Sequence, residues 1–439
     1  MPVSPPHEAD VPLMDTGADL HRWATELFPI CRSLTGDGVR TTLAYLKTLL
    51  PSLALHEVPS GTRALDWTVP DEWNIRDAYI ADVDGRRLVD FRESNLHVVG
   101  YSEPVDQVMD RDELEPHLHS LTEQPDAIPY VTSYYKRTWG FCVTQTQREQ
   151  LGRGPFHVRI DSTLAPGSLN YADLVIPGET EDEVLLSTYV CHPSMANNEL
   201  SGPVVTVALG RWLASLPLRR YTYRLVFAPE TIGAIVYLSR HLDHLRERVR
   251  AGWVATCIGD DRAYSYVPSR LGATLADRIS RCVLDESVPA WVEYSFLERG
   301  SDERQWCSPG ADLPVCSVMR SKYGTFPEYH TSLDGLDFVT PAGLQGGLDV
   351  IRRCIELLES NRHWRAVLPG EPQLGPRGLY PTTSYKGSAT DARMMMNVLA
   401  YCDGDHDVVR LAERTGAPTS TVVEILERLA KAGVIQAVD

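Results

Sequence analysis

Apolar and polar positions change their spacing several times along the chain, and these changes divide it into regions. Across residues 17–50, apolar residues recur at helical spacing, which predicts two helices separated by a turn at 31–38. Across residues 60–151, short apolar and aromatic runs are broken by turn residues, including the hairpin signal Asp84-Gly85. We therefore predict two N-terminal helices followed by a small β subdomain with long loops.

Beyond residue 151, strand-like and helix-like patterns alternate. Alternation of this kind predicts a doubly wound, mostly parallel α/β sheet with helices on both faces. The predicted strands are 158–160, 171–176, 184–186, 223–228, 253–258 and 313–318, and the predicted helices are 204–213, 232–246, 273–283 and 341–360.

The end of the chain has a different pattern. A linker rich in Pro and Gly at 368–378 precedes three helical stretches and a short strand, a succession typical of a winged helix. The helical stretches are 391–400, 407–414 and 420–432, and the strand is 434–438. The predicted domains are the N-terminal helices (17–59), the inserted β subdomain (60–151), the α/β domain (152–366) and the winged-helix-like domain (379–439).

Charge argues against a nucleic-acid partner. The 439 residues carry 42 Lys and Arg against 59 Asp and Glu, a formal charge of −17, so the average surface repels phosphate and anionic lipid. The helix at 420–432 has Arg428 and Lys431 but also Glu424 and Glu427, and therefore no basic face. We expect this domain to serve in packing or oligomerisation, which leaves a homo-oligomer through the inserted or C-terminal domain open.

The cysteines and the N-terminus indicate a cytoplasmic protein. Nine scattered cysteines without a Cys-x-x-Cys pair suit a reducing compartment better than a disulfide framework. Residues 1–16 are an acidic, Pro-rich lead-in without the pattern of a signal peptide, and no apolar run approaches the length of a membrane span. We expect neither secretion nor a membrane partner.

Candidate chemistry begins with His192, in the polar stretch 187–202 between a predicted strand and a predicted helix. In open α/β sheets such strand ends hold the active site, and imidazole both ligates metals and titrates near neutrality. A lone histidine is more often a structural residue. Carboxylates or a second histidine at equivalent strand ends would favour a functional His192 over a structural one.

Three such groups follow along the chain. Glu230 comes directly after a predicted strand, where it could equally cap the next helix. Asp302 lies in a charged loop that could be a solvated salt-bridge cluster, and His330 follows another strand. Histidine, acid and histidine on strand-end loops form a nitrogen and oxygen ligand set for zinc, with Glu230 as general base on water.

Four motifs extend this pattern: Cys191-His-Pro-Ser, Pro229-Glu-Thr-Ile-Gly, Gly300-Ser-Asp-Glu-Arg-Gln and Pro327-Glu-Tyr-His-Thr-Ser. Together they resemble a bacterial aminopeptidase-like family of the co-catalytic zinc aminopeptidase clan, over nearly the whole chain after Gly17. The resemblance implies a zinc-peptidase-like α/β body with an inserted β subdomain and a C-terminal winged helix. It also implies His192, Asp302 and His330 as metal ligands and Glu230 as general base.

Two positions depart from the clan. Asn198 stands where an aspartate bridges two metals in the clan, and Thr231 follows Glu230 where a second glutamate is common. Glu199, next to Asn198, is expected to point elsewhere. Two dications close together need bridging negative charge, so we predict one Zn²⁺ per chain rather than a pair.

Other side chains could bind the substrate. Arg304, Arg320 and Tyr323 could hold a carboxylate or carbonyl oxygen, and Tyr134 and Tyr135 could form a rim, although packing or surface ion pairs explain each equally well.

The leading hypothesis is a zinc-dependent hydrolase of an amide bond in a small peptide or amino-acid conjugate. One alternative is a catalytically altered or inactive member that serves as a scaffold or in small-molecule biosynthesis. A DNA-binding regulator is a third.

Overall fold

The computed structural model describes residues 14–379 and 388–438 and divides into two compact units. The first unit holds the described residues up to 276 together with 291–349, and the second holds 277–290 together with those from 350 onward. Residues 1–13 of the lead-in lie outside the described residues. In the described ranges, every helix is too short or too polar to cross a membrane.

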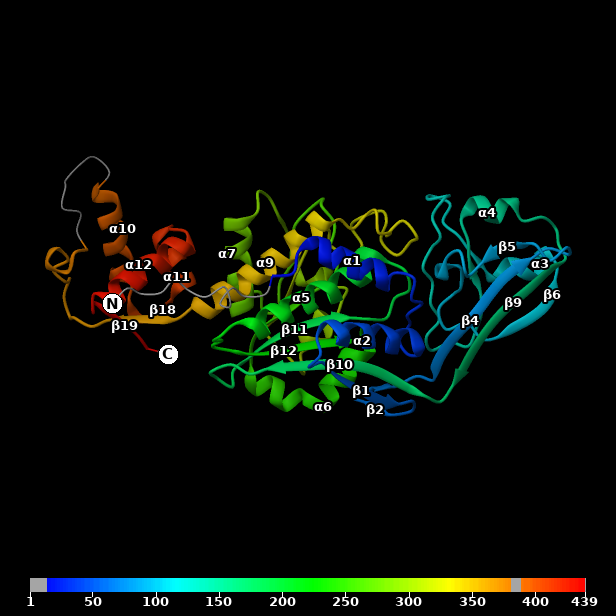
Figure 1. The fold of residues 1–439 in the computed structure, drawn as a ribbon, viewed down its shortest axis with the longest axis horizontal. Coiled ribbons are helices and arrows are strands. Elements are labelled where there is room, and N and C mark those ends of the chain that lie inside the picture. Colours follow the sequence, from blue (N-terminus) through cyan, green and yellow to red (C-terminus); the bar gives the residue numbers. More distant parts are fainter. Residues whose placement is uncertain (1–13, 380–387, 439) are drawn as a thin grey trace, which may run out of the picture. The chain divides into compact units, whose positions relative to one another are not determined.

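The described residues of the first unit form an eight-stranded sheet (Figure 1). Its central strands β12, β11, β13 and β16 are parallel, and antiparallel pairs join β1, β10 and β14 to it, so the sheet is mixed. Every residue of β11 and β12 is buried, as central strands covered on both faces require. In sheet order the strands are β1 (Ala54–Pro59), β10 (Ser168–Ile176), β12 (Thr222–Ala228), β11 (Glu183–Tyr189), β13 (Val249–Val254), β16 (Val315–Met319), β14 (Ser265–Val267) and β15 (Val292–Glu293).

Helices cover both faces of this sheet, which confirms the predicted architecture. α1 (Gly17–Leu27), α2 (Asp37–Leu49) and α5 (Ser201–Ser215) lie on one face, and α6 (Ile232–Arg248) lies on the other (Figure 1). A capping box between Thr16 and Asp19 begins α1. The short α8 (Glu303–Trp306) also belongs to the first unit. α9 (Pro341–Ser360) begins in the first unit and ends in the second, and α7 (Leu275–Ser287) lies almost wholly in the second.

The inserted region forms a four-stranded antiparallel sheet in the order β5 (Arg87–Asp90), β4 (Glu72–Ala81), β9 (Phe156–Ala165) and β6 (Val105–Met109). The hairpin signal at Asp84-Gly85 joins β4 to β5. The strand predicted at 158–160 belongs to this sheet rather than to the α/β sheet, because β9 pairs with β4 and β6. Its residues are buried mainly on alternate positions, as in a sheet with one covered face. Smaller elements complete the region: β2 (Arg63–Ala64), β3 (Trp67–Thr68), α3 (Arg111–Leu114), β7 (Leu118–His119), β8 (Phe141–Cys142) and α4 (Gln145–Gln150).

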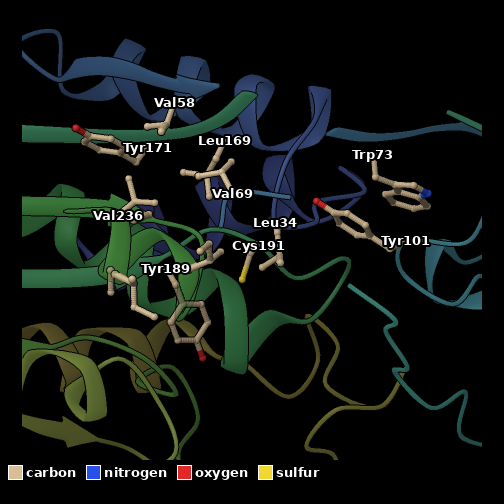
Figure 2. Packing of buried hydrophobic residues seen from close by; sticks show 14 of the residues in the cluster. Leu34, Val58, Val69, Trp73, Tyr101, Leu169, Tyr171, Tyr189, Cys191 and Val236 are labelled. Carbon is tan, nitrogen blue, oxygen red and sulfur yellow. The ribbon is translucent and has the colours of Figure 1, made fainter. Parts of the chain in front are cut away.

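A single apolar cluster connects the inserted sheet to the main sheet. Trp73 and Tyr101 stack with their ring centroids 5.9 Å apart, and the same cluster holds Leu34, Tyr189 and Cys191 beside the strand-end loops (Figure 2). The two sheets therefore share one core, which gives the loops between them a fixed support.

The strand predicted at 253–258 is shifted: β13 ends at Val254. The next residues are buried. Ala255 N–H still donates to Ser187 O of β11, but further along the chain two backbone N–H groups donate to side chains. Ile258 N–H donates to Ser201 Oγ and Gly259 N–H to Asn197 Oδ1. The apolar run at 253–258 therefore predicted burial correctly but overstated the length of the strand.

The second unit contains the winged helix. Its helices α10 (Ser388–Ala400), α11 (Val408–Thr415) and α12 (Thr419–Lys431) match the predicted stretches, and β19 (Ile435–Ala437) is the predicted strand. β19 and β18 (Asp403–Asp407) flank β17 (His363–Ala366) in a small sheet, and neither β17 nor β18 was predicted.

Candidate active site

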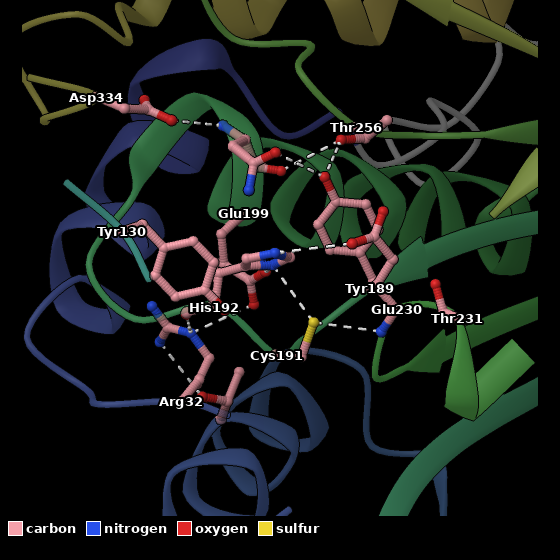
Figure 3. A network of polar contacts seen from close by, with 12 residues as sticks. Arg32, Tyr130, Tyr189, Cys191, His192, Glu199, Glu230, Thr231, Thr256 and Asp334 are labelled. Atoms are coloured by element: carbon pink, nitrogen blue, oxygen red, sulfur yellow. Dashed lines mark hydrogen bonds and ion pairs between the residues drawn. The ribbon is translucent and has the colours of Figure 1, made fainter. Parts of the chain in front are cut away.

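His192 lies in the loop after β11, and two buried charged residues hold it. Its Nδ1 is 2.9 Å from Glu199 Oε2, and Arg32 Nε lies 3.4 Å from Glu199 Oε1. Arg32 Nε also donates to the carbonyl of His192 at 2.9 Å. Glu199 belongs to a π-helical turn, Ala196–Leu200, that leads into α5, and Arg32 comes from the turn between α1 and α2 (Figure 3).

This arrangement fixes the imidazole. Burial opposes protonation, but the hydrogen bond to Glu199 and the charges of Glu199 and Glu230 together outweigh it and raise the pKa of His192. A carboxylate at Nδ1 holds the proton there and leaves Nε2 to face the site, as in the carboxylate–histidine pairs of metal sites. Nε2 lies 3.7 Å from Glu230 Oε2.

Glu230 follows β12 at a strained turn. Ile232 N–H donates to Glu230 O at 2.7 Å across Thr231, whose φ of 64° and ψ of −75° form a γ-turn of the rare kind. Burial raises the pKa of the Glu230 carboxyl. Strain at a β-branched residue next to a buried acid is the kind that collects at functional sites.

Asp302 and Glu303 are neighbours with different surroundings. Asp302 Oδ1 accepts from Thr231 N–H at 2.7 Å, whereas its Oδ2 is buried without a partner among the described residues. Burial, and then the charge of Glu230, raise the pKa of Asp302. Glu303 Oε1 accepts from Gly300 N–H, Ser301 N–H and the Tyr323 hydroxyl, so that carboxylate is fully engaged.

His330 lies close to His192 and Tyr130. Its ring stacks on Tyr329 and lies 5.5 Å, centroid to centroid, from the ring of His192. Burial, and then the charge of His192, lower the pKa of His330 to about 3, so this imidazole is neutral. Tyr130 N–H donates to His330 O at 2.8 Å, and the Tyr130 ring contacts both imidazoles edge-on.

Asn198 does not offer a negative charge to the site. Its Oδ1 accepts from the Tyr189 hydroxyl at 3.0 Å, and its Nδ2 is buried without a partner among the described residues. Its backbone N–H and that of Asn197 both donate to the carboxylate of Asp334. The amide is therefore oriented by Tyr189 in a loop that Asp334 holds.

Of these residues, Tyr130, His192, Glu230, Thr231 and His330 line a cavity of about 310 Å³. Of the predicted substrate-binding residues, Tyr134, Tyr135 and Arg304 line it, and Arg320 and Tyr323 do not. Arg320 instead stacks on Tyr264 and donates to Ala263 O. The lining residues are Leu34, Trp67, Tyr130, Thr132, Tyr134, Tyr135, Cys191, His192, Glu230, Thr231, Ile232, Arg304 and His330.

Some of these side chains could serve as metal ligands. The predicted ligands His192, Asp302 and His330 do not bring three donor atoms within 4.8 Å of one another; in the described chain Cys191, His192 and Glu199 do. In that group, however, the thiol and the carboxylate both contact His192 Nδ1, and burial holds the Cys191 thiol protonated by raising its pKa. A metal site here would depend on two donor atoms, His192 Nε2 and Asp302 Oδ2, which has no partner among the described residues. The pKa values of the Glu230 and Asp302 carboxyls are raised, and a bound cation would lower both of them.

The sequence reasoning missed part of this site. Arg32 carries no local signal, because an arginine in a helix–helix turn is ordinarily a surface residue. Glu199 was expected to point elsewhere, yet it contacts His192 within the same loop. The π-helical turn accounts for this, since its spacing differs from that of an α-helix.

Comparisons with known proteins agree with this fold. The chain is 44% identical over 404 residues, 92% of both chains, to a putative polysaccharide biosynthesis protein with an aminopeptidase-like domain from Clostridium acetobutylicum. A crystal structure described as a putative peptidase from the same organism matches with a TM-score of 0.91, at 41% identity and 96% coverage of both chains. The zinc aminopeptidase of Bacillus subtilis shares the fold alone, with a TM-score of 0.56, 10% identity, and coverage of 77% of this chain and 94% of that one.

The protein is thus an aminopeptidase-like α/β protein with a C-terminal winged helix. Residues 21–361 match the family described as a domain of unknown function, DUF4910, and residues 362–437 match a winged helix-turn-helix family. The chain belongs to the DUF4910 family.

Proposed function

We propose that the protein hydrolyses an amide bond of a small substrate with the help of one bound zinc ion. The observation that carries this proposal is Asp302 Oδ2, a buried carboxylate oxygen without a partner among the described residues, which shares a site with His192 and Glu230. The aminopeptidase-like relatives support the peptidase-like class of reaction.

His192 through Nε2, Asp302 through Oδ2 and His330 would hold the ion. His192 is ready for this role because Glu199 fixes its Nδ1. His330 is neutral and partly exposed to the cavity. When bound, zinc would polarise the substrate carbonyl and increase the acidity of water.

Glu230 is the general base. Its carboxylate takes a proton from the attacking water as the new C–O bond forms, and returns it to the leaving nitrogen as the C–N bond breaks. Burial raises the pKa of Glu230 and so suits it to both steps. Thr231 holds Glu230 in the strained turn through its N–H bond to Asp302.

A single ion is proposed because the position of the bridging aspartate holds Asn198. Its amide is neutral, and its oxygen already accepts from Tyr189. The same residue and Thr231 also favour a second candidate, a member without turnover that acts as a scaffold in biosynthesis. The name of the relative, a putative polysaccharide biosynthesis protein, is compatible with either role.

The test compares Glu230→Gln with Glu123→Gln, an exposed glutamate outside the cavity. Release of primary amine from a panel of N-acylated amino acids, amino sugars and dipeptides is measured, together with zinc content. We expect Glu230→Gln to lose about 10²–10⁴-fold in rate with unchanged zinc, and Glu123→Gln to match the wild type. Equal activity of Glu230→Gln would overturn the assignment, and zinc-loaded wild type without turnover on the panel would favour the scaffold.

A further inference from the structure

The cavity contains an arginine that forms no ion pair. The Arg304 guanidinium donates to the Thr231 hydroxyl, and no carboxylate of the described residues lies within ion-pair distance of it. Other arginines near the site, such as Arg32 and Arg262, are matched by glutamates. An exposed guanidinium in a cavity of a chain with a charge of −17 is available for bidentate binding of a carboxylate or phosphate.

Thr231 contacts Arg304 without neutralising its charge. A glutamate at position 231 would place a carboxylate where Arg304 now meets a neutral hydroxyl, and the ion pair would cancel the charge. The departure from the clan at this position therefore leaves a cation directed at the substrate.

The cavity lacks a matching anion for a substrate amine. Glu230 is the only carboxylate that lines it in the described structure, and the proposed reaction uses that group as the base. Of the two neighbouring acids outside the lining, Asp302 is assigned to the metal ion, and Glu303 already accepts three hydrogen bonds. A free peptide N-terminus would have no carboxylate of its own here, so the lining favours an acidic substrate over a basic one.

Two exposed aromatic rings stand at the edge of the cavity. Trp67, on the β2–β3 hairpin, and Tyr135, in the inserted region, are 39% and 57% exposed, and their rings meet edge to face at 5.8 Å. Aromatic faces bind apolar C–H surface, and the polar residues Thr132 and Tyr134 line the same cavity. A sugar ring, apolar on its faces and polar at its edge, matches both. A volume of about 310 Å³ is at the small end of ligand sites and suits one ring with its substituents.

We propose that the substrate is an N-acylated sugar that also carries an acidic group, with Trp67 and Tyr135 against the ring and Arg304 on the acidic group. This inference rests on the proposed amide hydrolysis for the N-acyl bond. The 44% identical relative, whose name refers to polysaccharide biosynthesis, supports the carbohydrate class.

Binding tests this without turnover. Zinc-loaded full-length Glu230→Gln is titrated calorimetrically with N-acetylglucosamine, N-acetylglucosamine-6-phosphate, N-acetylmuramic acid and the dipeptide Leu-Gly. We expect at least one acidic sugar to bind about tenfold or more tighter than N-acetylglucosamine, and the dipeptide to bind worst. The two acidic sugars distinguish a phosphate from a carboxylate.

Variants assign the residues. Added to Glu230→Gln, Arg304→Gln should remove the preference for acidic sugars, while Arg299→Gln, on the neighbouring loop outside the cavity, should keep it. Trp67→Ala should weaken all sugars alike, with partial recovery in Trp67→Phe. Tighter binding of the dipeptide, or an acidic preference that survives Arg304→Gln, would overturn the inference. If the binding pattern holds but the wild type releases no amine from these sugars, the hydrolysis proposal fails and the substrate class stands.

Discussion

The buried pair of Arg32 and Glu199 gives a sharp test of how the site is held. Both side chains have no solvent exposure, and Arg32 also donates to the carbonyls of Leu27 and His192. Arg32→Met keeps the length of the side chain but removes the cation beside the buried Glu199 carboxylate, which then keeps only His192 as a partner. Breaking a buried pair in this way costs about 3–5 kcal/mol. At about 2 °C per kcal/mol for a unit of this size, we expect the melting temperature of the first unit to fall by about 6–10 °C.

The assay is differential scanning calorimetry of Arg32→Met, Glu199→Gln and the double variant, at fixed zinc concentration. Because the double variant no longer buries an unpaired charge, its loss should be smaller than the sum of the single losses by about 1–3 kcal/mol. The control is Arg22→Met, which removes a surface pair with Asp19 in which Arg22 is 58% exposed. Its cost should stay below about 1 kcal/mol. The reasoning would be refuted if the losses of unfolding free energy in Arg32→Met and Glu199→Gln simply added in the double variant. It would also be refuted if Arg32→Met cost no more than the control.

Two further predictions concern other parts of the chain. The Arg40 guanidinium, which binds Glu72 in a bidentate pair, lowers the pKa of that carboxyl to about 2, so this stability is present above pH 4.5 and is lost as the pH falls toward 2. Glu72→Gln should therefore melt at a lower temperature than the wild type at neutral pH, and its melting temperature should fall less between pH 4.5 and 2. If the melting temperatures of the variant and the wild type depend on pH in the same way, the role of the Arg40–Glu72 pair is contradicted. In the second unit, the Glu286 carboxylate accepts from Thr419 N–H and Oγ1 at the start of α12. In helix-turn-helix proteins this end of the equivalent helix contacts the DNA bases, so here a negative charge stands where DNA would bind. We expect no salt-dependent binding to random duplex DNA in a fluorescence anisotropy titration, and a steep salt dependence would show otherwise.

Local patterns carried much of the fold. The apolar repeat of α9 gave the same bounds as the structure, and the buried runs of β11 and β12 lie within the predicted sheet. Patterns failed where buried backbone N–H groups donate to side chains rather than to a strand, as at Ile258 and Gly259, and where β9 joined the inserted sheet. A single sequence does not state which strands pair over long separations.

The same limit explains the site. His192 and Glu230 could be anticipated because the carboxyl ends of neighbouring parallel strands meet, and β11 does pair with β12. Arg32 reaches the site across 160 residues of sequence, a contact that no local spacing announces. Arg320 and Tyr323 were singled out by residue type, but packing against Tyr264 and Glu303 occupies them instead. The metal-ligand roles of His192, Asp302 and His330 stay predictions.

The most direct test of the central claim is an anomalous-scattering map of crystals grown with zinc. The account predicts one zinc peak per chain, beside His192 Nε2 and Asp302 Oδ2, and a second peak in Asn198→Asp, where a carboxylate replaces the neutral amide. No peak at this site, or two peaks in the wild-type chain, would contradict the account.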